Sequence, residues 1–149
     1  MGDTTYRARW GSEPLPIDDA AYDVVHASHV IEHIPWYDVR GACDEVYRIL
    51  RPGGVFEVHT VDFERVMSVA LNHGEGDGWT CGGRVRTLMD WVNARVFAYE
   101  RDGENNWHKS LFTLEYLTDI LIGCGFVSVI PCSPNHHGVI DLAVRAYKP

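Results

Sequence analysis

The chain has 149 residues, 46% of them hydrophobic and 23% charged, which suits one globular domain with a hydrophobic core. No apolar run approaches the roughly 18 residues that span a bilayer, and the N-terminus lacks the apolar segment of a secretory signal. The net charge of −8, without a cluster of Lys and Arg, argues against nucleic acid as the main partner. No two of the four cysteines form a C-x-x-C pair, so reduced thiols are expected. Together these features predict a cytoplasmic protein that binds neither membrane nor nucleic acid.

The first half of the chain has the pattern of a strand, a helix and a second strand. Tyr22–Ala27 is short, apolar and β-branched, as in a buried strand. A short helical turn over Val30–Ile34 is ended by Pro35, and Asp38–Leu50 then has the apolar spacing of an amphipathic helix. The segment Arg-Pro-Gly-Gly turns the chain into the next strand, Val55–Val61. Such a unit has a right-handed crossover, so its two strands should be parallel.

The second half is expected to be mainly helical before it ends in two strands. The expected helices are Phe63–Leu71, Arg84–Tyr99 and Thr113–Ile122, and the glycine-rich stretch Asn72–Gly83 is expected to be a loop. The final strands, Phe126–Pro131 and Val139–Tyr147, are joined by a connection too short for a helix, so they should be antiparallel.

Several segments, in this order, resemble class I S-adenosylmethionine-dependent methyltransferases, and more narrowly a group of small predicted methyltransferases. The matching segments are Leu15–Asp18, Tyr22–Val25, His29-Val30-Ile31-Glu32-His33, Glu45–Gly54, Val61–Arg65, His108–Leu117 and Gly125-Phe126. Together they extend over most of the chain from Glu13 onward. The resemblance implies a methyl transfer from S-adenosylmethionine to an acceptor that the sequence does not identify.

The resemblance also implies an α/β fold. The family sheet has the strand order 3-2-1-4-5-7-6, and this chain would supply a partial Rossmann-like sheet of strands 4-5-7-6, with strand 7 antiparallel and helices on both faces. Residues 1–149 would form a single, truncated methyltransferase-like domain with a helical or loop insert at about 64–107. Tyr6–Trp10 could be a remnant of strand 3.

The family holds its cofactor with a glycine-rich turn after strand 1 and with acidic residues after strands 2 and 3. The residues ahead of Leu15 are too few for the first two features, and Trp10-Gly11-Ser12 stands where the third acid would be. The resemblance therefore assigns the cofactor to the loop around Gly11, Ser12 and Leu15 and to the end of strand 4 at Ser28 and His29.

Three residues are candidates for catalysis: His29, Asp62 and His108. The first two follow the carboxyl ends of parallel strands, where ligands gather in open α/β sheets. A neutral imidazole at His29 could orient a substrate or accept a proton, and the alternative is that it only caps the next turn. His108 could face the acceptor pocket or merely precede the helix that starts at Thr113.

Two motifs suggest other functions. One is the H-x-x-E-H pattern of zinc proteases, which matches His29-Val30-Ile31-Glu32-His33. Because Pro35 ends this helical turn almost at once, a structural role for His33 is favoured and no metal is expected. Gly74-Glu75-Gly76-Asp77-Gly78 matches G-x-G-x-G and would suit a circularly permuted enzyme. Since Phe63–Leu71 has a helical rather than a strand pattern, a loop or lid is favoured there.

In the family order, strand 4 pairs with strand 1, and the residues ahead of Tyr22 do not provide a strand 1. The segment Tyr22–Ala27 would then present an open edge that invites pairing with another chain. A homodimer or a partner chain at this edge is expected. Two functions stay open: a methyltransferase, or a catalytically inactive remnant that acts as a binding or assembly module.

Overall fold

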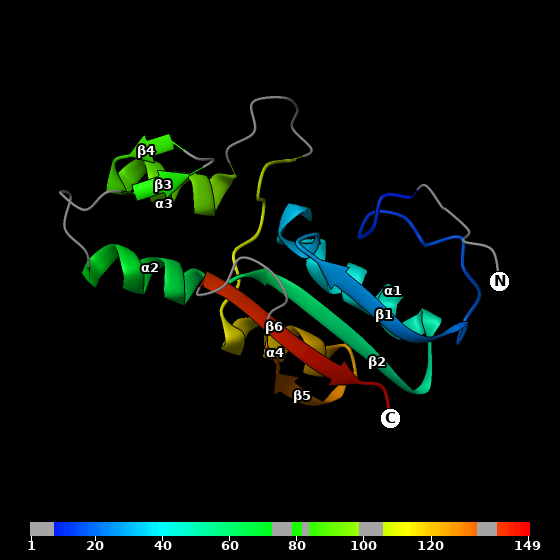
Figure 1. Ribbon diagram of the computed structural model, residues 1–149. Coiled ribbons are helices and arrows are strands. Elements are labelled where there is room, and N and C mark those ends of the chain that lie inside the picture. Colours follow the sequence, from blue (N-terminus) through cyan, green and yellow to red (C-terminus); the bar gives the residue numbers. More distant parts are fainter. Residues whose placement is uncertain (1–7, 73–78, 82–83, 99–105, 134–139) are drawn as a thin grey trace.

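A computed structural model describes residues 8–72, 79–81, 84–98, 106–133 and 140–149 of the chain. Its main sheet has four strands in the order β1-β2-β6-β5. Their bounds are Tyr22–Ser28 for β1, Leu50–Val61 for β2, Asp141–Tyr147 for β6 and Val127–Pro131 for β5. Strand β1 is parallel to β2, while β6 is antiparallel to both of its neighbours. The predicted order 4-5-7-6, with strand 7 antiparallel, is confirmed (Figure 1).

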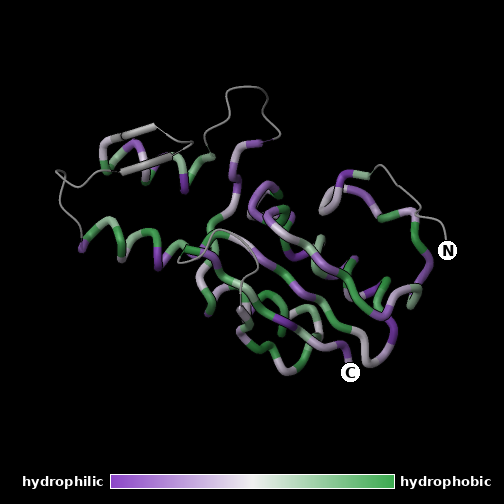
Figure 2. Tube along the Cα trace, in the orientation of Figure 1, coloured by the Kyte–Doolittle hydropathy of each residue, from purple (hydrophilic) through white to green (hydrophobic). Residues whose placement is uncertain are grey.

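Two helices pack on one face of this sheet: α1 (Val39–Ile49) and α4 (Leu114–Gly123). Alternate residues of β2 point towards them, and Phe56 and Val58 are fully buried among the apolar side chains of both helices. Figure 2 shows hydrophobic positions along the strands of the sheet and along the helices beside it. Burial of one face of β2 explains why apolar and polar residues alternate from Phe56 to His59.

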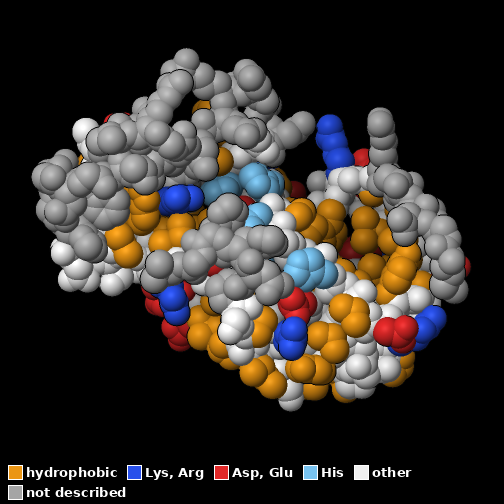
Figure 3. Space-filling model, viewed as in Figure 1, with side chains coloured by type: hydrophobic (Ala, Val, Ile, Leu, Met, Phe, Trp, Pro, Cys, Tyr) orange, Lys and Arg blue, Asp and Glu red, His pale blue; other side chains and the backbone are white. Residues whose placement is uncertain are grey.

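The opposite face of β1 is not covered in the part of the chain that the structure describes. Tyr22 and Val24 are 40% and 60% exposed there. In the space-filling view, hydrophobic side chains lie at this surface beside acidic, basic and histidine side chains (Figure 3). Strand β1 is also an edge strand, because it pairs only with β2 among the described residues. The expected strand-3 remnant is wrong for Ala8–Trp10, which form no strand, and its first two residues lie outside the described ranges.

The turn expected at Arg51–Gly54 is instead part of β2. The chain end explains this difference, because Gly53 donates a backbone hydrogen bond to Lys148 and Lys148 donates one to Gly54, both at 2.9 Å. Gly53 reaches this position with φ of +78°, a conformation that glycine adopts without strain.

A second group of elements follows β2: α2 (Phe63–Asn72), β3 (Trp79–Cys81), β4 (Arg84–Arg86) and α3 (Leu88–Phe97). Strands β3 and β4 pair antiparallel, so the expectation of a loop over the whole of Asn72–Gly83 and of a helix from Arg84 is wrong. The helix begins only after Thr87, which forms a capping box with Asp90. Helices α2 and α3 pack around a small second core of Val66, Trp91 and Ile140. No described helix is long and apolar enough to cross a membrane.

Candidate functional site

The carboxyl ends of β1 and β2 lie at one rim of the sheet, and His29 is the first residue after β1. Its backbone nitrogen donates to the carbonyl of His59 at 2.9 Å, and its φ is +52°. This left-handed conformation, uncommon for a residue with a side chain, turns the chain out of the strand and into the short 3-10 helix η1 (Ile31–His33). The side chain of His29 does not cap η1, because that helix has no side-chain cap.

Two buried carboxylates face the imidazole of His29. Its Nδ1 lies 3.0 Å from Oε1 of Glu32, and its Nε2 lies 3.5 Å from Oδ2 of Asp141. Hydrogen bonding to Asp141 and then to Glu32 raises the pKa of His29 from 6.5 to about 9, although burial opposes this. The raised pKa favours the cationic imidazole at neutral pH, whereas the sequence analysis considered a neutral one, and a role for His29 as proton acceptor stays a prediction.

Glu32 connects the rim to the segment that precedes α4. Its side chain is almost fully buried, and its Oε2 accepts a hydrogen bond from Thr60 at 3.1 Å. Burial would raise the pKa of Glu32, but the hydrogen bond to His29 holds it below the ordinary value. The backbone carbonyl of Glu32 accepts from the nitrogens of Lys109 and Ser110 at 2.7 and 3.1 Å. Glu32 thus holds both sides of the rim together.

His33 and His108 stand face to edge beyond Glu32, with ring centroids 5.1 Å apart and an interplanar angle of 70°. The Nδ1 of His33 lies 3.3 Å from the carbonyl oxygen of Trp107, and the Nδ1 of His108 lies 3.1 Å from that of Arg95. Burial lowers the pKa of His108, so this ring is neutral at pH 7. The structure therefore brings two of the three predicted catalytic residues, His29 and His108, to one place at the rim.

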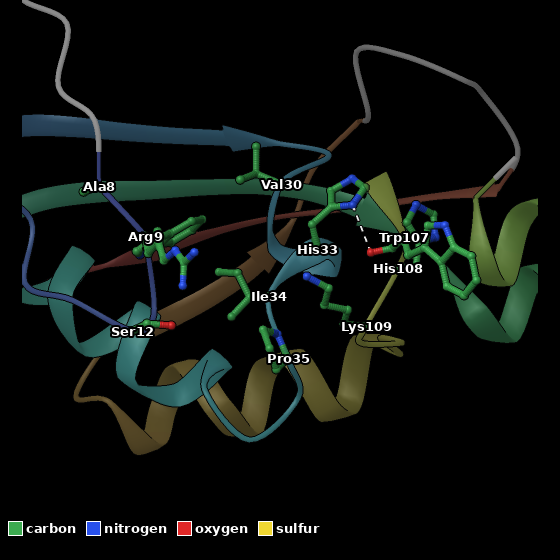
Figure 4. Close-up of a pocket in the computed structure, with 11 residues that line it drawn as sticks. Ala8, Arg9, Ser12, Val30, His33, Ile34, Pro35, Trp107, His108 and Lys109 are labelled. Atoms are coloured by element: carbon green, nitrogen blue, oxygen red, sulfur yellow. Dashed lines mark hydrogen bonds between the residues drawn. The ribbon is translucent and has the colours of Figure 1, made fainter. Parts of the chain in front are cut away.

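A cavity of about 810 Å³ opens beside these rings. Ser12 and its neighbours Ala8, Arg9 and Trp10 form one wall, and the other wall is formed by Val30, His33, Ile34, Pro35, Trp107, His108 and Lys109. Figure 4 shows that the first wall comes from the N-terminal segment and the second from the turn after β1 and from the segment before α4. Of the five predicted cofactor residues, only Ser12 lines this cavity.

Among the other predicted cofactor residues, Gly11 and Leu15 contact protein rather than the cavity. Gly11 has φ of +93°, and a Cβ there would lie 2.9 Å from Cγ2 of Ile34. The backbone nitrogen of Leu15 donates to the carboxylate of Glu45 at 2.9 Å. Ser28 is half-buried at the end of β1 and does not line the cavity. Close packing of the N-terminal loop on α1 explains these positions.

Asp62, the third predicted catalytic residue, is held at the start of α2. Its Oδ1 accepts from the backbone nitrogen of Arg65 at 3.2 Å, and its Oδ2 lies 3.3 Å from the Arg65 guanidinium. This is the geometry of a helix N-cap, which satisfies one of the free N–H groups of the first turn. Asp62 does not line the large cavity.

The comparisons with known proteins agree with this fold. Residues 9–58 match the family model of a methyltransferase domain. A probable S-adenosylmethionine-dependent methyltransferase of Mycolicibacterium smegmatis is 50% identical over 46 residues, which are 31% of this chain and 17% of that protein. An uncharacterized Escherichia coli protein, YafE, is 29% identical over 74% of this chain and 58% of its own length. The chain thus spans less than two thirds of either curated relative.

Solved structures show the same fold at lower identity. A methyltransferase from Methanosarcina mazei superposes with a TM-score of 0.56 at 17% identity, over 95% of this chain and 65% of that one. The 1,6-didemethyltoxoflavin-N1-methyltransferase of Burkholderia thailandensis, with bound S-adenosylhomocysteine, gives 0.53 at 14% identity, over 95% and 48%.

The chain is thus similar to S-adenosylmethionine-dependent methyltransferases over residues 9–58, and it shares the fold of that family. S-adenosylmethionine is the cofactor of this family, and the cavity fits one part of it. Trp10, Val30 and Ile34 offer apolar surface for a flat ring, and Ser12 offers a hydroxyl. No carboxylate lines this cavity in the described residues, so the acid that accepts hydrogen bonds from the ribose in this family has no counterpart there. The residues present therefore match the adenine side of a methyltransferase site and not its ribose clamp.

Sequence reasoning missed two acidic residues of this site. Glu32 entered the sequence analysis only as a letter of the segment His29–His33, and Asp141 entered it only as a strand residue. The signal at Asp141 was the acid itself, since it opens a strand, Asp141–Tyr147, in which Arg145 is the one other charged residue. Burial of an acid requires a partner, and here His29 provides one. The glycine motif Gly74–Gly78 lies outside the described residues, but Leu71 and Asn72 ahead of it end helix α2.

Proposed function

We propose that this chain carries the adenine side and the acceptor side of a methyltransferase site that transfers a methyl group from S-adenosylmethionine to an acceptor still to be identified. The observation that carries the proposal is the cavity of about 810 Å³ beyond the carboxyl end of β1, between Ser12 and His108. Ligands of open α/β sheets bind at this edge. Methyl transfer is mainly a matter of positioning donor and acceptor in line, which a cavity with few catalytic groups can provide.

The predicted site residues divide between the two walls of this cavity. Ser12 belongs to the cofactor side, and His108, neutral and half-buried, belongs to the acceptor side, where it is suited to accept a proton. His29 is cationic and paired with two carboxylates, which suits a positioning role better than that of a base. Asp62 serves as a helix cap in this proposal, and its predicted catalytic role stays a prediction.

Calorimetric titration of the purified chain with S-adenosylmethionine and S-adenosylhomocysteine tests this proposal. We expect heat from both ligands, and we expect Ser12→Phe to abolish it by filling the cavity. Ser68→Phe, at an exposed position of α2 away from the cavity, is the matched control. If millimolar ligand gives neither heat nor a thermal shift, the isolated chain does not bind the cofactor and the proposal fails for it.

A second function is a catalytically inactive module that binds or assembles with other chains. The open edge of β1 favours it, because an unpaired strand edge is a template for another strand. We infer that two copies of the chain pair along Tyr22–Ala27 to form a continuous sheet across a homodimer. The same edge would serve a separate partner chain that adds strands to the sheet. A cytoplasmic location, expected from the unpaired thiols Cys43, Cys124 and Cys132, accompanies either function.

Light scattering after gel filtration distinguishes these assemblies. Val24→Lys places a charge on the exposed face of the edge strand and should shift the dimer towards monomer. Ile122→Lys is the control, since Ile122 is exposed to a similar degree on α4. If the wild type is monomeric at high concentration, the homodimer is ruled out. If Val24→Lys and Ile122→Lys shift the dimer towards monomer to the same extent, the β1 edge is ruled out as the contact.

A further inference from the structure

Three side chains at the rim have the composition of a metal site. One ligand atom from each of Glu32, His33 and His108 lies within 4.8 Å of the other two. Zn²⁺ binds imidazole nitrogen at about 2.0–2.1 Å, so two of its ligand atoms lie about 3.4 Å apart. The three groups would therefore need to approach one another by at most about 1.4 Å. Two imidazoles and one carboxylate form a ligand set that leaves a coordination position open.

The hydrogen bonds around this cluster orient the ligands for a metal. The Nδ1 atoms of His33 and His108 both lie against backbone carbonyls, so each ring would donate there and direct the lone pair of Nε2 elsewhere. Thr60 and His29 hold the carboxylate of Glu32 from its two oxygens. Metal-binding histidines and carboxylates are commonly fixed by outer partners of this kind.

The charge of the surrounding pocket favours a cation. The carboxylates of Glu32 and Asp141 are 2% and 1% exposed, and His29 is the ionisable group that pairs with both. Among the residues that the structure describes, the carboxylate of Asp141 faces one partner, Nε2 of His29, at the long distance of 3.5 Å. Arg95 lines the same small pocket of about 160 Å³, but its guanidinium stacks on Trp91 and forms no ion pair with a described carboxylate. Buried carboxylates are stable when a cation compensates them.

We propose that Glu32, His33 and His108 bind one divalent transition-metal cation of the Zn²⁺ class. His33 and His108 line both the small pocket and the large cavity, so the open coordination position faces the space assigned to the acceptor. The histidine side chains gather at the centre of Figure 3, where this rim meets the surface. The zinc-protease pattern implied a different ligand set, the pair His29 and His33, whereas here His29 faces carboxylates.

A second cluster of His26, Glu57 and His59 has a similar composition. There the carboxylate of Glu57 already binds the guanidinium of Arg145, so a metal would have to compete with a permanent cation. His26 is 44% exposed in its side chain and can be replaced without disturbing the core. This makes His26→Ala the matched control for the cluster that we propose.

Calorimetry of the EDTA-treated and dialysed chain with ZnCl₂, without any cofactor, tests the metal site separately from methyl transfer. We expect one equivalent to bind with micromolar or tighter affinity, and Co²⁺ to give visible absorption bands of an imidazole-ligated ion. His33→Ala and His108→Ala should each weaken binding at least about tenfold, because loss of a direct ligand costs no less than loss of an outer partner. His26→Ala should leave the affinity unchanged.

Three results would overturn the proposal: no zinc heat in the wild type, unchanged affinity in both the His33 and the His108 variant, or loss of binding in His26→Ala instead. Circular dichroism checks that each variant folds. If His108→Ala does not fold, His33→Ala gives the same test at a ring that is half-buried and hydrogen-bonded through a single nitrogen. Heat with zinc but not with S-adenosylmethionine would support the metal site alone, and the reverse would support the cofactor site alone.

Discussion

The ion pairs of His29 predict how the stability of the fold depends on pH. The pKa of His29 is about 9 in the folded chain and 6.5 without its partners, so the folded state holds a proton that the unfolded state loses between these values. The stabilisation is fully present below pH 6.5 and is lost as the pH rises through 9. At 1.36 kcal/mol per pKa unit its upper bound is about 3 kcal/mol. Since the side chain is 24% exposed, solvent screening reduces this, and we expect about 1 to 2 kcal/mol.

Urea unfolding of the wild type and of His29→Gln, both in EDTA, measures this contribution. The difference in unfolding free energy between the two proteins should be largest at pH 6.5 and should shrink by about 1 to 2 kcal/mol at pH 9.5. Because the effect is a difference between proteins, ionisable groups outside the His29 cluster cancel. His26→Gln is the control and should show no comparable change. A difference between wild type and His29→Gln that is the same at both pH values would refute the reasoning.

Three further substitutions test the packing around the site. Gly125→Ala should destabilise the fold by about 1 to 2 kcal/mol more than Gly53→Ala in urea unfolding. Both glycines have positive φ, but only at Gly125 would a Cβ meet another side chain, the Tyr47 ring at 3.2 Å. Equal losses of unfolding free energy in the two variants would contradict this. Ser110→Ala should cost about 1 to 3 kcal/mol, since the buried hydroxyl donates to a carbonyl at 2.6 Å, and Ser110→Thr should cost less if the hydrogen bond is what matters. Arg48→Ala should accelerate proteolysis of the N-terminal loop, because the guanidinium donates hydrogen bonds to the carbonyls of two loop residues at once. Arg48→Lys should be cleaved as fast as Arg48→Ala, since an ammonium lacks this forked geometry. Protection of either variant equal to that of the wild type would refute this.

The sheet could be predicted from the sequence because burial of one face leaves a clear pattern. Phe56 and Val58 alternate with polar residues along β2, whereas β6 is buried at nearly every position and is recognised as a short apolar run. The strand order itself came from the family resemblance rather than from this pattern. The hairpin Trp79–Arg86 could not be predicted, because glycine-rich sequence usually indicates a loop and its two strands have only three residues each.

The site was predicted in part. His29 and His108 were identified because they lie near the ends of recognisable elements, and the structure does bring them to one rim. The protonation state of His29 was not predictable, because it depends on Asp141, which is more than a hundred residues away in the sequence. Gly11 and Leu15 were assigned to the cofactor by resemblance, and their contacts with α1 residues and Ile34 come from packing that only three dimensions reveal.

Glu32 is the residue on which the proposed metal site depends most, and its several contacts decide which residues should be substituted to test that site. Its carbonyl binds the segment that carries His108, its carboxylate binds His29 and Thr60, and the same carboxylate is a proposed metal ligand. A substitution of Glu32 would therefore alter folding, charge and metal binding together, and no single measurement could separate them. His33 and His108 each contribute one ring at the surface of this network. Variants of these two rings can remove the metal while Glu32 and His29 keep the rim in place, so they distinguish a functional site from a structural ion-pair cluster.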